Sequence, residues 1–139
     1  NRTWLVKRAI DAGATHILFV DSDMIFPANT LKQLLSHEKE IVGVEYHKRQ
    51  FPLEVIGTPT EERSETELYK AKYAGTGLLL VDLKVFSKIE GAWFLFGRDS
   101  EGALVMGEDV YFCNKARDAG FDIWIDPSVK MGHVGEYIY

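Results

Sequence analysis

The sequence predicts an α/β fold, because two predicted helices are each followed directly by a short apolar strand. Residues 2–13 have the apolar spacing of a helix, and the continuous apolar run His16–Val20 comes next. Near the end of the chain, the predicted helix Glu108–Ala119 is followed by the strand Phe121–Ile125 in the same way. A short continuous apolar run is typical of a strand buried on both faces of a parallel sheet, so we expect His16–Val20 to be buried in this way.

The first half of the chain contributes two helices and up to three strands. Leu5, Ala9 and Ile10 recur at helical spacing, and Gly13 stands where a helix commonly stops. The next element is a short helix that has Pro27 in its first turn and ends near Ser36, and Leu31, Leu34 and Leu35 make it amphipathic. Two strands follow, one over Ile41–Tyr46 and a weaker one over Leu53–Ile56. The polar, acidic stretch 58–67 is expected to be a surface loop.

The second half is expected to alternate strands and helices. The strand Leu78–Asp82 follows Gly75-Thr76-Gly77, and the short helix Leu83–Ile89 comes next. An edge strand or aromatic turn over Trp93–Phe96 and a loop over 97–102 follow. The last two elements are the helix Glu108–Ala119, which ends at Gly120, and the strand Phe121–Ile125, which ends before Pro127. Trp93, Phe94 and Phe96 offer aromatic faces that suit a sugar ring, although such residues more often belong to a core. Trp124, inside a strand, is expected to be a core residue.

Composition and charge exclude several classes of protein. The 139 residues fit one domain, 1–139, at the usual ~100–200 residues per domain, and 46% apolar with 27% charged residues is a globular composition. The net charge of −5 argues against a nucleic-acid partner, and an acidic protein that handles phosphates needs a metal ion to offset the repulsion. The longest apolar runs are far below the ~20 residues of a membrane span. Cys113 is the only cysteine, which fits the reducing environment of the cytoplasm.

Two aspartates follow the first predicted strand. Asp21 and Asp23 come directly after His16–Val20, and ligands of open α/β sheets bind beyond the carboxyl ends of the strands. Two carboxylates so close together share a small space readily only when a cation lies between them. The pattern therefore suggests a divalent metal bound together with phosphate oxygens. A solvated turn, with Asp23 as a local cap, explains the same residues equally well.

A second acidic pair opens the predicted helix Glu108–Ala119. Glu108 and Asp109 follow a glycine, and acidic side chains are favoured in a first helical turn because they face the positive end of the helix dipole. The same position holds a carboxylate rigidly enough to act as a general base beside an acceptor hydroxyl. Helix stabilisation and proton transfer are therefore both compatible with this pair.

A histidine near the C-terminus and a glycine-rich segment complete the candidate site. His133 follows the last strand and stands between two glycines, so we expect it to converge with Asp23 on one divalent ion in a mixed nitrogen and oxygen site suited to manganese. Gly75-Thr76-Gly77 lets a ligand approach the backbone closely, or forms an ordinary turn. The other histidines are assigned to the surface or to packing: His16, His37 and His47.

Three runs of sequence appear in an order that is more specific than any one of them. They are ILFVDSDM at 17–24, GTGLLLVD at 75–82, and GEDVYFCNKARDAGF at 107–121, which is followed by Asp126-Pro127 and Gly132-His133. In this order they resemble the GT-A glycosyltransferases, particularly family 2-like enzymes. The resemblance covers most of the chain and is most specific from Glu108 to Phe121. It implies a Rossmann-like mixed sheet flanked by helices, as in nucleotide-diphospho-sugar transferases, with this chain as the C-terminal portion of a GT-A domain truncated at its N-terminus.

The resemblance implies how a nucleotide-sugar donor is held. Asp21 would lie near the ribose or the metal, and Asp23 would bind the metal, Mn²⁺ or Mg²⁺, directly. His133 would add a further metal ligand. Gly75-Thr76-Gly77 would also belong to the donor site.

The resemblance also implies a reaction. Asp109 would be the catalytic base, with Glu108 as its neighbour. The activity would be a metal-dependent transfer of a sugar to an acceptor hydroxyl on a glycan, a lipid or a small molecule. Inversion follows if Asp109 takes the hydroxyl proton, and retention if it only orients the acceptor.

Two other functions share parts of this pattern. A phosphatase resembling the haloacid-dehalogenase group also opens its site with Asp-x-Asp after a strand, and uses the first aspartate as a nucleophile. Met24 and Ile25 stand where that group has small residues, which argues against it. A non-catalytic module or fragment that binds a sugar or nucleotide would use the same residues without turnover. Metal and nucleotide binding followed by a turnover assay separates the three.

Overall fold

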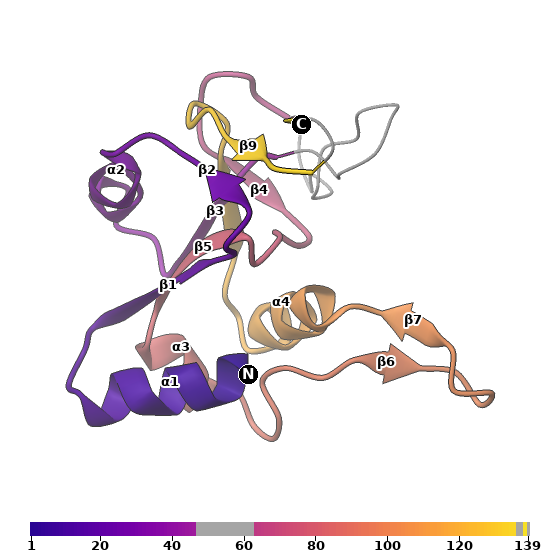
Figure 1. Cartoon of the computed structure of the whole chain (residues 1–139). Coiled ribbons are helices and arrows are strands. Elements are labelled where there is room, and N and C mark those ends of the chain that lie inside the picture. The colour runs from indigo at the N-terminus through magenta and orange to yellow at the C-terminus, as the bar shows by residue number, and fades with distance from the viewer. Residues whose placement is uncertain (47–62, 136–137, 139) are drawn as a thin grey trace.

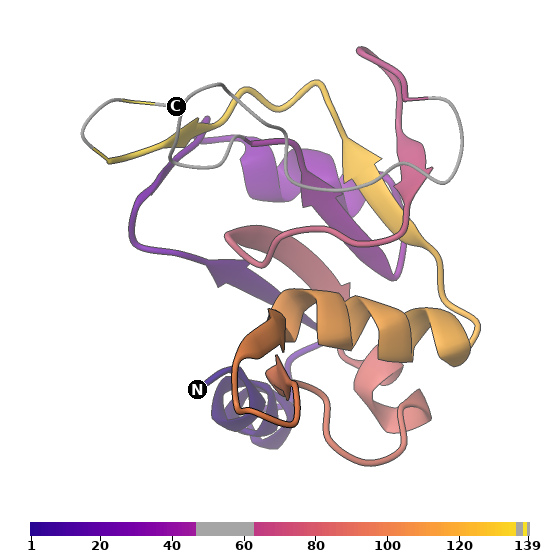
Figure 2. The same cartoon turned by 90° about the vertical axis from the view of Figure 1, so that its right-hand side faces the viewer.

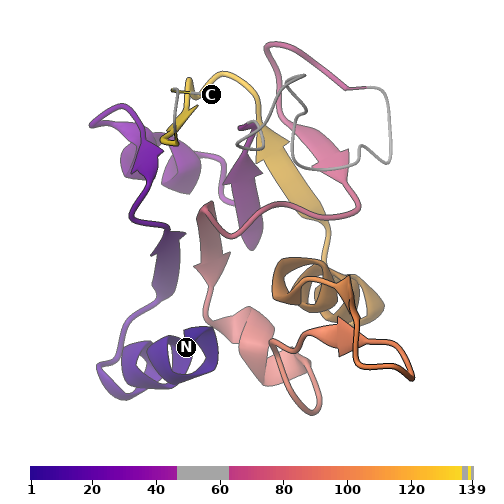
Figure 3. The same cartoon turned by 45° about the vertical axis from the view of Figure 1, so that its right-hand side comes forward.

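The computed structural model describes residues 1–46, 63–135 and 138. Their central element is a five-stranded sheet. In order across the sheet (Figure 1), the strands are β1 (His16–Val20), β5 (Leu78–Asp82), β3 (Ile41–Val44), β8 (Ile123–Asp126) and β4 (Tyr69–Ala71). β3 and β8 are parallel, and the other neighbours are antiparallel. β1, β3 and β8 therefore run in one direction and β5 and β4 in the other, as Figure 3 shows. The expected mixed α/β architecture is confirmed.

Helices cover both faces of this sheet. α1 (Arg2–Asp11), α3 (Lys84–Lys88) and α4 (Glu108–Asp118) lie on one face, and α2 (Thr30–Ser36) lies on the other (Figures 1 and 2). Along β5, Leu79 and Val81 pack in the apolar cluster that contains residues of α1, α3 and α4, whereas Leu78 and Leu80 pack with Leu34 of α2. This alternation is what a strand buried between two helical layers requires. In the described part of the chain, every helix is too short or too polar to cross a bilayer.

Two short ribbons stand outside the main sheet. β2 (Met24–Ile25) pairs with β9 (Gly132–His133), and β6 (Gly97–Arg98) pairs with β7 (Leu104–Met106), both antiparallel. The first ribbon joins segments from opposite ends of the chain, and the second leads directly into α4 (Figure 1). Strands of two or three residues carry no hydrophobic period, so the sequence predicted none of these four, nor β4.

Most of the expected elements are confirmed with small shifts of their ends. β5 has the expected bounds, and α4 ends one residue early. α1 also ends earlier than expected, before Gly13, whose φ of +74° favours glycine. β3 stops at Val44, and β8 begins and ends later than expected. The expected strand Leu53–Ile56 lies outside the described residues, and the described part of the loop 58–67, residues 63–67, contains no helix or strand.

The expectation that His16–Val20 is buried on both faces of a parallel sheet is wrong. Within β1 only Phe19 is buried, and Val20 is 43% exposed. β1 is one of the two edge strands of the described sheet, and its neighbour β5 is antiparallel. The apolar run is therefore covered less completely than the same pattern would be at the centre of a sheet.

Two helices bury only part of the face that their apolar spacing suggested: Ala9 and Leu34 pack in the core as expected. In α1, Val6 is completely buried, whereas Leu5 and Ile10 are 44% and 46% exposed. In α2, Leu34 is the buried leucine, and the helix begins three residues after Pro27 instead of around it. Short helices at the surface of one sheet bury only the turn that contacts it, so spacing alone does not select the face.

The aromatic segment 93–96 forms no strand, and its residues divide between the core and the surface: Phe96 is 54% exposed and Trp93 is partly buried against the core. Phe94 is buried, and its ring centroid lies 5.0 Å from that of Phe112 in α4. Trp124, expected in the core, is instead only partly buried, with the ammonium of Lys39 4.4 Å from its ring centroid. The Trp124 ring is thus covered on one face by the Lys39 side chain.

Candidate functional site

The direction of the strands brings the predicted motifs to one edge of the sheet. β1, β3 and β8 end at this edge, and the antiparallel β5 begins there. The segments at this edge are Asp21–Asp23 after β1, Tyr46 after β3, Gly75–Gly77 before β5 and residues 127–131 after β8. The site is therefore assembled from both ends of the sequence, as expected for an open α/β sheet.

Asp23 and His133 meet at this edge through the β2–β9 ribbon. The His133 Nε2 atom lies 3.1 Å from Asp23 Oδ2, although the residues are 110 positions apart. The backbone N–H of Val134 donates to the carbonyl oxygen of Asp23 at 2.8 Å, and Met24 pairs with His133. The ribbon thus places a carboxylate and an imidazole side by side, and the structure brings together the two residues that we expected to converge.

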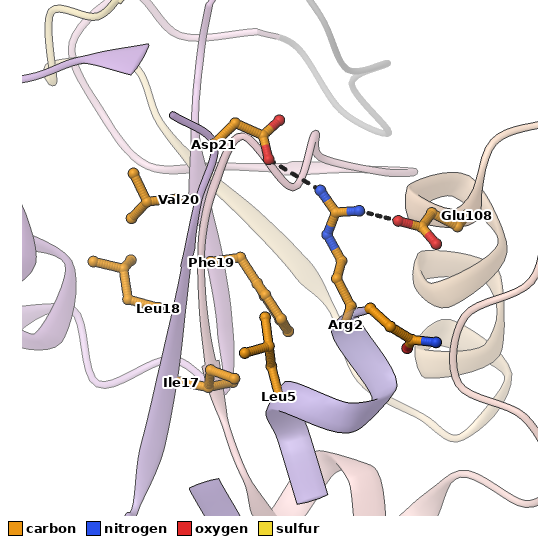
Figure 4. A pocket seen from close by; sticks show the side chains of 9 residues that line it. Arg2, Leu5, Ile17, Leu18, Phe19, Val20, Asp21 and Glu108 are labelled. Atoms are coloured by element: carbon orange, nitrogen blue, oxygen red, sulfur yellow. Dashed lines mark hydrogen bonds and ion pairs between the residues drawn. The ribbon is translucent and has the colours of Figure 1, made fainter. Parts of the chain in front are cut away.

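Asp21 is engaged with a residue that the sequence analysis did not single out. The Nη2 atom of Arg2 lies 3.1 Å from Asp21 Oδ1, and Nη1 of the same guanidinium pairs with Glu108. Figure 4 shows the Arg2 side chain reaching from α1 between the two carboxylates. Asp21 does not join Asp23 and His133: in the described ranges, no three His, Cys, Asp or Glu side chains are grouped closely enough to hold a metal.

The position of Arg2 in the chain could have indicated its contact with Asp21. α1 is joined to β1 by the short turn 12–15, so the chain reverses and the start of the helix returns toward the end of the strand. A cation in the first turn of that helix then faces Asp21. An arginine is suited to this place because its planar group can bridge two carboxylates at once.

Tyr46 lies at the centre of the site and was also missed. Its hydroxyl accepts the N–H of Gly77 at 3.1 Å, and its ring stands edge-on to the ring of His133 with centroids 5.6 Å apart. Burial and the negative charges of Asp109 and Asp21 raise the pKa of Tyr46 to about 12. The hydroxyl therefore stays protonated, and both acidic motifs are near enough to act on it. Its place two residues after the buried β3 could have indicated this role.

Asp109 is the second residue of α4, and its side chain is held at the start of that helix. Its Oδ1 atom accepts the N–H of Val110 at 2.8 Å. A Cβ atom at Gly107 would lie only 2.7 Å from the same oxygen, so the glycine leaves room for this orientation. Asp109 and Glu108 are both half-buried, but only Glu108 pairs with Arg2. The two members of the acidic pair thus have different surroundings.

Gly77 lets the backbone approach Tyr46 closely. A Cβ atom there would lie 2.2 Å from Met24 Cε and 2.7 Å from the Tyr46 hydroxyl. The carbonyl oxygen of Gly77 accepts the N–H of Asp21 at 2.9 Å. Neither the ordinary turn nor a ligand is needed to explain this glycine, because the close neighbour is a side chain of the protein itself.

We expect Gly77→Ala to displace Tyr46 and to lower the free energy of unfolding by about 1–3 kcal/mol, the usual cost of overpacking. Urea denaturation of the two proteins measures the change. Gly102→Ala is the comparison for backbone strain without a steric clash, because its φ is +84° and an added Cβ would meet no atom within 4 Å. A Gly77→Ala variant with wild-type stability would show that Tyr46 and Met24 are not confined as the structure indicates.

A charged cluster beside Tyr46 fixes the start of the segment after β3. The Glu45 carboxylate accepts two hydrogen bonds from Arg63, each 2.7 Å long, and one from the Tyr69 hydroxyl at 2.5 Å. Burial alone raises the pKa of Glu45, but the hydrogen bonds from Arg63 and Tyr69 outweigh it and hold the pKa below its ordinary value.

This lowered pKa predicts a loss of stability in acid. A carboxyl whose pKa is lower in the folded state contributes stability that is complete above its ordinary pKa and is lost as the pH falls through the folded value. The urea midpoint should therefore decline below about pH 4, and decline less steeply in Glu45→Gln. Equal slopes in the two proteins would contradict the assignment.

A cavity of about 500 Å³ opens beside Asp21. It is lined by Asn1, Arg2, Leu5, Glu108 and residues 17–21 of and after β1. Figure 4 shows Leu5 and Ile17 on one side of the strand, with the charged groups of Arg2, Asp21 and Glu108 at one end. An apolar wall with a few polar groups at one end suits a ligand with a flat ring and polar substituents.

Comparisons with known proteins identify the fold and no sequence relative. No family model and no curated protein matches the chain. Among solved structures, A197 from STIV is similar with a TM-score of 0.71 and 16% identity, over 96% of this chain and 65% of that chain. GalNAc-T7, solved with UDP, GalNAc and Mn²⁺, is similar with a TM-score of 0.58 and 16% identity, over 94% of this chain and 30% of that chain. The fold is similar to that of a glycosyltransferase.

This likeness supports the GT-A-like architecture that the sequence motifs implied. The chain spans 65% and 30% of the two similar chains, so it corresponds to a part of each. UDP, GalNAc and Mn²⁺ are ligands of the GalNAc-T7 structure and are not shown for this chain.

Proposed function

We propose that this chain carries the site of a GT-A glycosyltransferase, family 2-like, that transfers a sugar from a nucleotide-sugar donor to an acceptor hydroxyl. The observation that carries the proposal is the meeting of Asp23 Oδ2 and His133 Nε2, 3.1 Å apart, at the edge where the parallel strands end. The similar fold of a protein solved with UDP and Mn²⁺ supports the same chemistry here. Following the resemblance of the sequence motifs, we propose residues 1–139 as the C-terminal portion of a catalytic domain; the chain spans 65% and 30% of the two similar chains.

The pair Asp23 and His133 fits a divalent cation, Mn²⁺ or Mg²⁺. A carboxylate oxygen and an imidazole nitrogen form a mixed donor set that suits manganese. Ions in nucleotide sites commonly use one or two protein side chains and complete their coordination with phosphate oxygens, so two side chains suffice when a diphosphate is present. When bound, the ion would offset the charge that develops on the departing nucleoside diphosphate.

The cavity beside Asp21 is the proposed place for the nucleoside of the donor. Asp21 can accept a hydrogen bond from a ribose hydroxyl, while the apolar wall that contains Leu5 and Ile17 faces the base. Gly75-Thr76-Gly77 contributes by fixing the backbone of Asp21, because the Gly77 carbonyl holds its N–H. The Arg2 guanidinium lies where the negative charge of a diphosphate would approach.

Asp109 is the proposed base. It takes the proton from the acceptor hydroxyl as that oxygen attacks the anomeric carbon, which inverts the configuration in a single displacement. The first turn of α4 orients the carboxylate, and Glu108 beside it is occupied by Arg2. If the reaction instead retains the configuration at the anomeric carbon, Asp109 only orients the acceptor.

Binding and turnover measurements test this function. Isothermal titration of the protein that carries this chain with UDP and other nucleoside diphosphates, with and without Mn²⁺, should show binding that depends on the metal. Incubation with the corresponding nucleotide sugars and candidate acceptors should then release the nucleoside diphosphate and form a glycoside. Binding without product would indicate a binding module, and release of inorganic phosphate would indicate a phosphatase. If no nucleoside diphosphate binds with Mn²⁺, the proposal is wrong.

A further inference from the structure

A second cluster of polar side chains lies at the carboxyl end of β8. Asp126 ends this strand, its side chain is 3% exposed, and it bonds to two different elements. Its Oδ2 atom accepts from Gln33 Nε2 at 3.0 Å and lies 2.6 Å from His37 Nε2, both at α2. Its Oδ1 atom accepts from the N–H and the hydroxyl of Ser128, at 2.9 and 2.6 Å. We call these four residues the Asp126 clasp.

The clasp is not a nucleophilic triad, although it contains the same three residue types. In a triad the histidine lies between the hydroxyl and the carboxylate and removes the hydroxyl proton. Here the Ser128 hydroxyl donates directly to Asp126 and accepts from Gln33 Nε2 at 2.6 Å. The hydrogen bonds join α2 to the segment after β8, so a mechanical role is the one that this arrangement supports.

Both elements held by the clasp lead to the candidate metal site. α2 follows β2, which comes directly after Asp23, and the segment after Asp126 leads through β9 to His133. Midway along this segment, Val129 is buried in the same apolar cluster as Leu34 of α2. α2 and the segment after β8 are therefore packed as one unit, and the β2–β9 ribbon extends from it.

We propose that Asp126 is a positioning residue that holds His133 against Asp23. By fixing Ser128 to α2, it sets the relative position of the two strands whose pairing brings the imidazole to the carboxylate. Two ligands of one ion must both stay within ~2.0–2.6 Å of it, so a small shift of one strand separates them from a common centre. Loss of the buried carboxylate also leaves several donors unsatisfied, which favours such a shift. The consequence for metal binding rests on the proposed function, whereas the consequence for the ribbon does not.

Hydrogen exchange tests the structural part of this inference. The amide of Val134 reports on the ribbon, because it donates to the Asp23 carbonyl. In Asp126→Asn its exchange should accelerate about tenfold or more, while the amides of β3 and β5 stay protected by the main sheet. Asp82→Asn is the matched control, since Asp82 also ends a strand near a histidine, His16 at 3.9 Å, but at the opposite edge. The control should exchange as the wild type does.

Mn²⁺ affinity, measured by electron paramagnetic resonance in the presence of UDP, tests the functional part. Asp126→Asn should weaken binding about tenfold, His37→Gln should weaken it less, and Asp82→Asn should not change it. His37 is more exposed than Asp126, so His37→Gln decides the matter if Asp126→Asn does not fold.

The outcomes separate the two proposals. Unchanged Val134 exchange in both clasp variants overturns the positioning role. Faster exchange with unchanged Mn²⁺ affinity also overturns it, because the ribbon would then move without consequence for the ligands. A wild-type protein that does not bind Mn²⁺ with UDP contradicts the proposed function, and the Val134 measurement still decides whether the clasp holds the ribbon.

Discussion

Replacing Asp109 with asparagine should lower sugar transfer by about two orders of magnitude or more, with nearly unchanged nucleotide affinity. A general base contributes typically ~10²–10⁴-fold, and it acts on the acceptor proton and not on the diphosphate. The asparagine oxygen can still accept the N–H of Val110, so the start of α4 is preserved. Steady-state turnover and titration with a nucleoside diphosphate, in the protein that carries this chain, measure the two effects separately.

Glu108→Gln is the matched comparison for this result. Glu108 is the adjacent carboxylate, but it pairs with Arg2, so its loss should affect the contact between α1 and α4 more than the proton transfer. We therefore expect a milder decrease in turnover. If Glu108→Gln loses turnover while Asp109→Asn remains active, the base is Glu108 and the assignment is wrong by one residue.

Replacing Asp23 with alanine should abolish metal-dependent binding of the donor nucleotide and leave the fold intact. The substitution removes the carboxylate beside His133, whereas the bond between the Asp23 carbonyl and Val134 belongs to the backbone and remains. Titration with Mn²⁺ and UDP measures the binding, and circular dichroism with urea denaturation measures the fold.

Asp82→Ala provides the control for loss of an aspartate after a strand. Its side chain is 23% exposed, close to the 27% of Asp23, but it lies at the opposite edge of the sheet. It should bind nucleotide as the wild type does. Unchanged Mn²⁺ and UDP affinity in Asp23→Ala would remove Asp23 from the site.

The parts of the site that could be predicted from sequence are those next to strands with a strong apolar pattern. Asp21 and Asp23 follow such a strand, and Asp109 opens a helix with clear ends. Strand direction then brings these motifs to one edge, which is a rule of α/β sheets rather than a property of any one residue. For the same reason His133 could be expected near Asp23 without knowledge of the β2–β9 pairing.

The positions of Arg2, Tyr46 and Asp126 at helix starts and strand ends were not sufficient to identify them. Each acts through a partner that is distant in sequence, and the residue types are common at helix starts and strand ends. The edge position of β1 could not be predicted either, because an apolar run does not indicate whether a strand has one neighbour in the sheet or two. Sequence patterns indicate which face of a single helix or strand is apolar, but the contacts between elements are known only from the three-dimensional structure.

The distance in sequence between Asp23 and His133 has a consequence for how the protein folds. Joining residues 110 positions apart in an unfolded chain costs about 4 kcal/mol of loop-closure free energy, and one side-chain contact does not offset it. The contact therefore forms after the main sheet has reduced that loop to a few short segments. At ~5–20 residues per second of synthesis, Asp23 leaves the ribosome many seconds before His133. A nascent chain thus carries Asp23 without His133 while the residues between them are made, and the pair closes only when β9 is in place.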